Sequence, residues 1–263
     1  MIGAIAGDII GSVYEARPIK RKDFPLFDPR CTFTDDSVLT IAVALAILTG
    51  KPYRDTVLEI GRSYPHAGYG GSFIRWLTSD NPQPYNSWGN GAAMRVSPVG
   101  FAFDTVEEVL EQARQTAVIS HNHPEGVKGA QATALAVFLA RSSHSKEEIR
   151  EQIGERFRYD LRRSVDEIRP GYSFRISCQE TVPEAIVAFL DSVSYEDAVR
   201  NAISLGGDSD TLACITGGVA EAYYGRVPET IRTKVRERLP SPLWKITEAF
   251  CRAYRLSERE SED

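Results

Sequence analysis

The sequence has few cysteines, no long apolar run and no excess of basic residues. Its four cysteines lie far apart without a Cys-x-x-Cys pair, which favours buried free thiols in a reducing cytoplasm over a zinc site or disulfides. No apolar run reaches the roughly 18 to 20 residues that cross a bilayer. The N-terminal segment does not resemble a signal peptide, because Asp8 and Glu15 interrupt the apolar stretch that a signal peptide needs. A net charge of −5 disfavours nucleic-acid binding. We therefore expect a cytoplasmic protein without membrane or nucleic-acid partners.

Signals for β-strands are also missing, since no segment alternates apolar and polar residues or carries a hairpin turn. Apolar residues recur instead at spacings of three and four, as at Ile2, Ile5 and Ile9. The same periodicity predicts helices in the segments 38–48, 106–119, 127–139, 182–190, 198–205, 212–223, 231–239 and 243–254. Gly50 and Gly225 stand where helices should end. The sequence thus predicts an all-α fold of about ten to twelve helices.

The chain length favours one domain with a sizeable core, because 263 residues are few for two full domains. No shift in composition marks a boundary, so we expect one compact domain over residues 1–257. The charged segment 258–263 is expected to fray. The segment 64–98 is dense in Gly, Pro, Asn and Ser, and an irregular loop of that length is usually functional.

The first expected helix combines small residues with two acids. Gly3, Gly7 and Gly11 recur every four residues, so another helix can pack very closely on that face. Asp8 and Glu15 are seven residues apart and therefore share a face of the helix. Taken alone, this pattern favours a tightly packed helix whose Glu15 is a solvated end residue.

Two more acidic segments, Thr34-Asp35-Asp36 and Gly206-Gly207-Asp208-Ser209-Asp210-Thr211, directly precede apolar helices. Taken singly, each is typical of a helix cap. If these segments and Glu15 converge, however, four or five carboxylates share one pocket, where like charges repel and divalent cations would relieve the repulsion. The ligands are all oxygen atoms, which favours magnesium or manganese over zinc.

A glycine-rich segment follows, Asn86-Ser87-Trp88-Gly89-Asn90-Gly91-Ala92-Ala93-Met94-Arg95. Small residues let backbone N–H groups approach an anion, and a helix that begins near Ala92 would direct its positive end at a phosphate. The segment is neither a Walker loop nor a Rossmann fingerprint. Taken alone, the pattern is weak, and a Gly-Asn-Gly turn without a ligand is the default interpretation.

Two histidines flank Asn122 in Ser120-His121-Asn122-His123-Pro124, where Pro124 should open the next helix. They therefore lie near whatever the start of that helix faces. A structural role is favoured for His123. For His121, a structural role and a ligand contact both stay open.

Five motifs occur in order along the chain: Gly7-Asp8-x-x-Gly11-x-x-x-Glu15, Thr34-Asp35-Asp36, Gly89-Asn90-Gly91-x-x-Met94-Arg95, Ser120-His121 and Gly206-Gly207-Asp208-x-Asp210-Thr211. In this order they resemble the ADP-ribosylglycohydrolase family, as does the segment from Ile176 to Pro183. The resemblance implies an all-α fold of orthogonal helices around a dinuclear metal centre, usually of Mg²⁺ or Mn²⁺.

The resemblance also implies roles for individual residues. The implied metal ligands are Thr34, Asp35, Asp36, Asp208, Asp210 and Thr211. Glu15 would act at the reacting ribose. The diphosphate would be held by Ser87, Trp88, Gly89, Asn90 and Gly91, with the ring of Trp88 against adenine. His121 would approach the phosphates and Ile176 would flank the adenosine.

The implied activity is metal-assisted hydrolysis of the N- or O-glycosidic bond between ADP-ribose and a protein side chain or small conjugate. This reaction reverses mono-ADP-ribosylation, and ADP-ribose is its product. The bond would break with oxocarbenium-like charge, and two cations would activate the water. Glu15, Asp35 or Asp36 would transfer the proton.

Two alternatives come from other functional classes. One is a non-catalytic ADP-ribose-binding module, which the intact set of metal positions disfavours. The other is a magnesium-dependent isoprenoid-diphosphate enzyme, but its Asp-Asp-x-x-Asp motif is broken here by Ser37-Val38-Leu39. The basic loop that carries Arg17, Lys20, Arg21 and Lys22 could attract a diphosphate or only solvate a surface.

Overall fold

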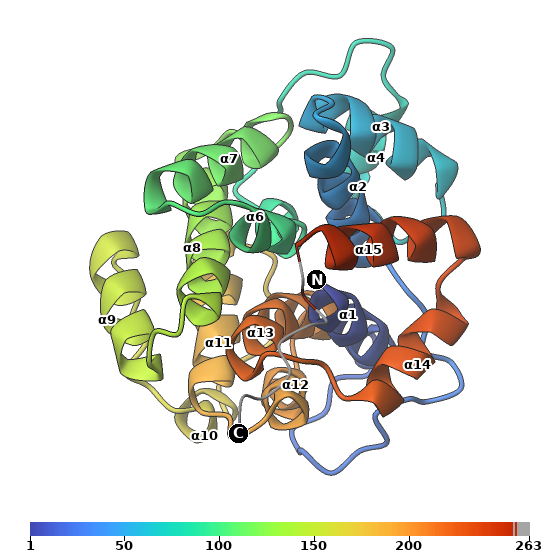
Figure 1. The fold of residues 1–263 in the computed structure, drawn as a ribbon. Coiled ribbons are helices and arrows are strands. Elements are labelled where there is room, and N and C mark those ends of the chain that lie inside the picture. The colour runs from blue at the N-terminus through green and yellow to red at the C-terminus, as the bar shows by residue number, and fades with distance from the viewer. Residues whose placement is uncertain (255, 257–263) are drawn as a thin grey trace.

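The computed structural model describes residues 1–254 and residue 256. These residues form helices α1 to α15 and contain no named strand, so the all-α prediction is confirmed (Figure 1). The predicted tail at 258–263 lies outside the described residues. The helices are α1 (Ile2–Glu15), α2 (Asp35–Thr49), α3 (Tyr53–Ser63), α4 (Gly71–Thr78), α5 (Gly91–Met94), α6 (Ser97–Ala102), α7 (Val106–Val118), α8 (Pro124–Arg141), α9 (Lys146–Phe157), α10 (Val165–Ile168), α11 (Cys178–Leu190), α12 (Tyr195–Ser204), α13 (Ser209–Tyr224), α14 (Glu229–Arg238) and α15 (Ser241–Ala253).

Three short helices account for part of the difference between the helices of the described residues and those that the sequence predicts. Helices α5, α6 and α10 have 4, 6 and 4 residues, too few to show a 3.6-residue period. The expectation of an irregular loop over residues 64–98 is wrong in part. This segment contains α4, α5 and the start of α6.

The centre of the fold is the contact between α1 and α13. The two helices lie side by side in the middle of the molecule, with α11 and α12 packed on α13 and α2 beside α1 (Figure 1). Ile5 and Ile9 of α1 and Ala213 and Ile215 of α13 are buried. Each Å² of apolar surface removed from water contributes roughly 25 cal/mol. This pair therefore fixes the end of α1 against the start of α13.

Glycines make the contact between these two helices unusually close. A Cβ atom on Gly7 would overlap the carbonyl group of Ala213, and one on Gly11 would lie 2.6 Å from the Cα atom of Asp210. The close packing predicted for this helix face is confirmed. The contacting residues have increasing numbers along α1 and decreasing numbers along α13, so the two helices are antiparallel.

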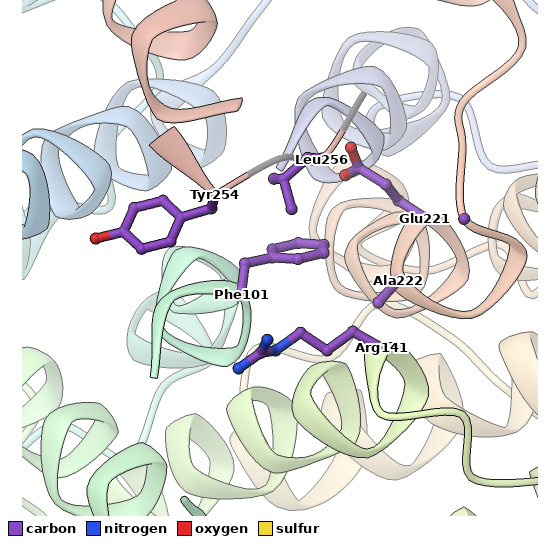
Figure 2. A pocket seen from close by; sticks show the side chains of 7 residues that line it. Phe101, Arg141, Glu221, Ala222, Tyr254 and Leu256 are labelled. Carbon is purple, nitrogen blue, oxygen red and sulfur yellow. The ribbon is translucent and has the colours of Figure 1, made fainter. Parts of the chain in front are cut away.

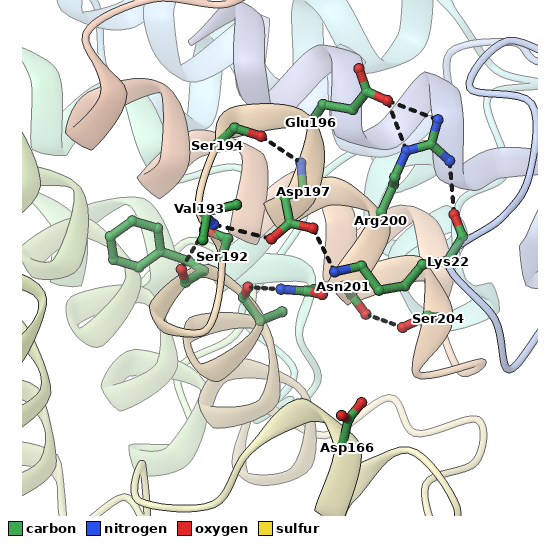
Figure 3. A network of polar contacts seen from close by, with 12 residues as sticks. Lys22, Asp166, Ser192, Val193, Ser194, Glu196, Asp197, Arg200, Asn201 and Ser204 are labelled. Carbon is green, nitrogen blue, oxygen red and sulfur yellow. Dashed lines mark hydrogen bonds and ion pairs between the residues drawn. The ribbon is translucent and has the colours of Figure 1, made fainter.

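Cationic side chains hold the loop 16–34, which joins α1 to α2, against the rest of the fold. The Lys20 ammonium group donates hydrogen bonds to the backbone carbonyls of Arg169, Tyr172 and Leu205. Figure 3 shows Lys22 paired with Asp197 of α12, and Arg200 donating to the carbonyl of Lys22 at 2.8 Å. Lys20 and Lys22 thus bind their own chain, which neither interpretation of this basic loop anticipated.

A small cavity of about 40 Å³ lies between α6, α8, α13 and the end of α15. Phe101, Arg141, Glu221 and Tyr254 surround it (Figure 2). Glu221 accepts a hydrogen bond from the backbone N–H of Gly3 at 2.8 Å. Ligand pockets measure about 300 to 1,000 Å³, so this space is a gap in the packing.

The four cysteines are buried and form no disulfide, as predicted. Burial raises the pKa of the Cys178 thiol to about 12, so this thiol stays protonated and unreactive at neutral pH. In the part of the chain that the structure describes, no helix combines the length and apolarity needed to cross a membrane.

We expect Gly7→Ala to destabilise the protein. Alanine favours a helix interior over glycine by about 0.5 to 1 kcal/mol, but its methyl group would overlap the backbone of α13, and overpacking costs roughly 1 to 3 kcal/mol. Urea unfolding measures the net loss. Gly171→Ala is the control, because nothing lies within 4 Å of a Cβ atom there. Equal stability of Gly7→Ala and the unmodified protein would contradict the close packing.

Candidate active site

A cavity of about 560 Å³ opens where the end of α1 and the starts of α2, α4 and α13 meet. Every site residue predicted from the sequence lines it: Glu15, Thr34, Asp35, Asp36, Ser87, Trp88, Gly89, Asn90, Gly91, His121, Ile176, Asp208, Asp210 and Thr211. Segments far apart in the chain thus meet at one site.

Three acidic side chains gather at one end of this cavity. One carboxylate oxygen from each of Glu15, Asp208 and Asp210 lies within 4.8 Å of the others, so this group could hold a metal ion. Asp208 precedes α13 and Asp210 lies in its first turn, where the positive end of the helix favours negative charge. Asp35 and Asp36 occupy the first turn of α2 on the same cavity.

Asp8 fixes the start of α2 beside this group. Its buried carboxylate accepts hydrogen bonds from the N–H and hydroxyl groups of Thr34, at 2.9 and 2.6 Å. It also accepts from the N–H of Ser37 at 3.0 Å and from the hydroxyl group of Ser37. Asp8 therefore positions Asp35 and Asp36 without lining the cavity. The sequence placed it on the helix face of Glu15 but did not suggest this role.

The crowded acids strongly perturb one another. Burial, then the charge of Asp8, raises the pKa of Asp35 to about 8. Burial and neighbouring carboxylates raise the pKa values of Asp36 and Asp210 well above the usual range. The Oδ2 atom of Asp36 is buried and has no hydrogen-bond partner among the described residues. Protons or cations must offset this concentration of negative charge.

The glycine-rich loop forms another wall of the cavity and is held from two sides. The N–H of Asn90 donates to the carbonyl of Ile176 at 2.8 Å, and the N–H of Cys178 donates to the carbonyl of Trp88 at 3.0 Å. The Asn90 side-chain amide donates to Asp208 at 2.8 Å. The loop is thereby joined to the acidic end of the cavity.

The order of these segments matches a known family. A sequence model described as ADP-ribosylglycohydrolase matches residues 1–261. The chain belongs to this family. It is 29% identical to the ADP-ribosylhydrolase ARH3 of Bos taurus, over 88% of this chain and 86% of that protein. It is 23% identical to the ADP-ribosylarginine hydrolase Tri1 of Pseudomonas putida, over 86% of this chain and 69% of that protein.

The fold of this ADP-ribosylglycohydrolase family member also matches a solved structure. That structure is described as an ADP-ribosylglycohydrolase-related protein complex. The superposition has a TM-score of 0.72, covers 97% of each chain and aligns residues that are 22% identical. The two chains therefore share one all-α fold.

The two histidines of the segment from Ser120 to Pro124 have different surroundings. The His123 ring caps α8 and accepts a hydrogen bond from the N–H of Glu125 at 3.1 Å, the structural role favoured for it. The buried His121 ring lines the cavity, and its Nδ1 atom lies 2.8 Å from the hydroxyl oxygen of Ser120. Of the two, only His121 lines this cavity.

Several lining residues of this family member were missed by the sequence analysis. They belong mainly to the segment 64–98 and include Gly68, Gly70, Gly71, Ser72, Phe73 and Tyr85, together with Leu39 and Phe174, while Arg95 had a place in a motif but no assigned role. The composition of 64–98 suggested function without selecting residues. Phe174 and Ile176 are each 51% exposed and Trp88 is 45% exposed, so an apolar rim borders the opening.

We expect the metal-free protein to lose stability as the pH rises. Folding raises the pKa of Asp35 from 3.8 to about 8, so the folded state binds more protons than the unfolded chain within that window. The melting temperature in chelator should therefore fall between about pH 5 and pH 8. Magnesium replaces the lost protons, so it should raise the melting temperature more at about pH 8 than at about pH 5.

Thermal melts with chelator or magnesium at both pH values provide this measurement. Asp36→Asn removes one buried carboxyl group whose pKa is raised by folding, so it should flatten the fall. Asp55→Asn, on the first turn of α3 and outside the cavity lining, serves as the control. A magnesium effect that is absent, or larger at the lower pH, would contradict the cation-binding interpretation.

Proposed function

We propose that this protein is a metal-dependent ADP-ribosyl hydrolase. It cleaves the N- or O-glycosidic bond between ADP-ribose and a protein side chain or small conjugate. The observation that carries the proposal is a single cavity with a crowded acidic group at one end and a glycine-rich loop on its wall. One ligand with a diphosphate and a reacting ribose would use both.

The glycine-rich loop suits a diphosphate. Ser87, Gly89 and Gly91 line the cavity and are partly exposed, and small residues let N–H groups contact phosphate oxygens. The four-residue helix α5 adds little dipole of its own. Trp88 and Ile176 at the exposed rim would contact adenine, which leaves the distal ribose near the acidic end.

The acidic end fits divalent cations. Its donors are all oxygen, and the buried Oδ2 atom of Asp36 has no hydrogen-bond partner among the described residues. We propose that two Mg²⁺ or Mn²⁺ ions are held by the carboxylates and hydroxyl groups of Thr34, Asp35, Asp36, Asp208, Asp210 and Thr211. When bound, such ions supply Lewis-acid chemistry and lower the pKa of a bound water.

The residues of the chain orient the ribose and move the proton. As the bond at the anomeric carbon breaks, positive charge develops on the ribose, and the nearby carboxylates favour that charge. Burial and the charges of Asp208 and Asp8 raise the pKa of Glu15, and a raised carboxyl pKa is typical of a general acid or base. Glu15, Asp35 or Asp36 passes the proton. Contacts to adenosine and diphosphate supply binding energy far from the bond that breaks.

The leaving group determines which ADP-ribosyl conjugate the protein hydrolyses. The relatives are named for hydrolysis of ADP-ribosyl groups, and Tri1 for ADP-ribosylarginine in particular. The test is a panel of ADP-ribosyl-arginine, ADP-ribosyl-serine, O-acetyl-ADP-ribose and ADP-ribosylated nucleic acid, each with magnesium and with chelator. We expect magnesium-dependent release of ADP-ribose from at least one of the first three. Binding of ADP-ribose without any turnover would instead support the non-catalytic module.

Two variants should affect ADP-ribose binding and hydrolysis separately. Trp88→Ala should weaken ADP-ribose binding by about five- to a hundredfold, because an aromatic side chain stacked on a base contributes roughly 1 to 3 kcal/mol. Glu15→Gln should leave binding within a few fold while turnover falls at least about a hundredfold, because its role is expressed mainly at the transition state. Calorimetric titration and a turnover assay measure the two effects.

Thermal melts of both variants give the control for folding. Trp88 is half-exposed, so its removal should leave the melting temperature nearly unchanged. Unaltered affinity in folded Trp88→Ala would remove the stacking role. Normal turnover in Glu15→Gln would remove Glu15 from the chemistry.

A further inference from the structure

A fully buried arginine lies behind the glycine-rich loop. Arg95 follows α5, has no exposed surface and contributes to the cavity lining. Its Nη2 atom donates to the carbonyl of Thr116 at 2.7 Å and to the hydroxyl oxygen of Ser120 at 2.9 Å. Burial lowers its pKa to about 10, so it stays cationic at neutral pH.

The charge of Arg95 has no carboxylate partner among the ion pairs of the described residues. Its Nε and Nη1 atoms are buried without a hydrogen-bond partner in that part of the chain. A buried charge without a counter-ion is costly. Besides its two hydrogen bonds, the guanidinium group has the ring of Phe73 nearby, with the ring centroid 5.9 Å from the guanidinium carbon. Such an arrangement favours an anion in the adjoining cavity.

The hydrogen bonds of Ser120 indicate which ring nitrogen of His121 carries a hydrogen. The hydroxyl oxygen of Ser120 is fully buried and accepts from Arg95, so its own hydrogen needs an acceptor. The Nδ1 atom of His121, at 2.8 Å, is the acceptor that the described residues provide. If Nδ1 carried a hydrogen, the buried Ser120 hydroxyl hydrogen would have no partner. Nδ1 therefore accepts, and the hydrogen of the neutral imidazole resides on Nε2.

The Nε2 edge of His121 faces the glycine-rich loop. A Cβ atom on Gly91 would lie 2.9 Å from Nε2 and one on Gly89 would lie 3.8 Å from it. The ring of Tyr85, with its centroid 5.5 Å away, packs against the imidazole. Burial and the charge of Arg95 lower the pKa of His121 well below its usual value, so the ring stays neutral near pH 7.

We propose that Arg95 and Ser120 form a positioning relay that fixes His121 as a neutral Nε2–H donor toward an anion at the glycine-rich loop. The charge of Arg95, which no side chain neutralises, also lowers the cost of bringing that anion into the cavity. Under the proposed function, on which this assignment of the ligand rests, the anion is the diphosphate of ADP-ribose. Arg95 and Ser120 are positioning residues, since they act through His121.

Nitrogen NMR of the ligand-free, histidine-labelled protein tests the relay without any assumption about function. His121→Asn identifies the His121 signals among those of the four histidines. We expect a protonated Nε2 and an unprotonated Nδ1 in the unmodified protein, and a mixture of tautomers in Ser120→Ala. The matched control is Ser97→Ala, at a buried serine whose hydroxyl group has no partner in the described residues. It should keep the signals of the unmodified protein.

A double-mutant cycle on ADP-ribose affinity supplies the second measurement. Ser120→Ala should weaken binding by about threefold to tenfold, the effect of one hydrogen bond. In a His121→Ala background, the same change should cost nothing further, because Ser120 acts through the imidazole. A proton on Nδ1 in the unmodified protein, an unchanged tautomer in Ser120→Ala or additive losses in the cycle would each overturn the relay. Failure of the unmodified protein to bind ADP-ribose would instead overturn the proposed function.

Discussion

The close antiparallel contact between α1 and α13 is the constraint on which the site depends. With Gly7 and Gly11 against the backbone of α13, the end of α1 has one position relative to the start of its partner. Glu15 and the Asp208–Asp210 turn therefore meet within 4.8 Å. Bulkier side chains on this helix face would separate the helices and with them the carboxylates. The packing that stabilises the core is thus also what concentrates negative charge.

That concentration of charge links the remaining parts of the site. Asp8 fixes the start of α2 through Thr34 and Ser37, which adds Asp35 and Asp36 to the cavity. The raised pKa values of these acids reflect the free energy needed to bury their negative charges close together. Another part of the cavity lining has the opposite charge, because Arg95 is a buried cation beside a neutral histidine. The proposed ligand, with a diphosphate and a ribose that becomes cationic in the transition state, complements both groups.

The long helices and the motif residues could be predicted because both depend on local pattern. Periodicity located helices such as α7 and α13, and spacing placed the glycines of α1 on one face. Helices α5 and α10 were missed because four residues cannot display a period. The roles of Asp8, Lys20 and Arg95 were also missed, since each depends on partners from distant segments. Convergence of the acidic segments was a conditional expectation, and only the packing of α1 on α13 shows how they meet in space.

A crystal structure with ADP-ribose and Mn²⁺, using the anomalous signal of manganese, tests the central claim most directly. The account predicts anomalous peaks beside Asp36, Asp208 and Asp210, with the diphosphate against Ser87 to Gly91 and the distal ribose at the acidic end. Manganese bound elsewhere, or ADP-ribose bound outside this cavity, would contradict it.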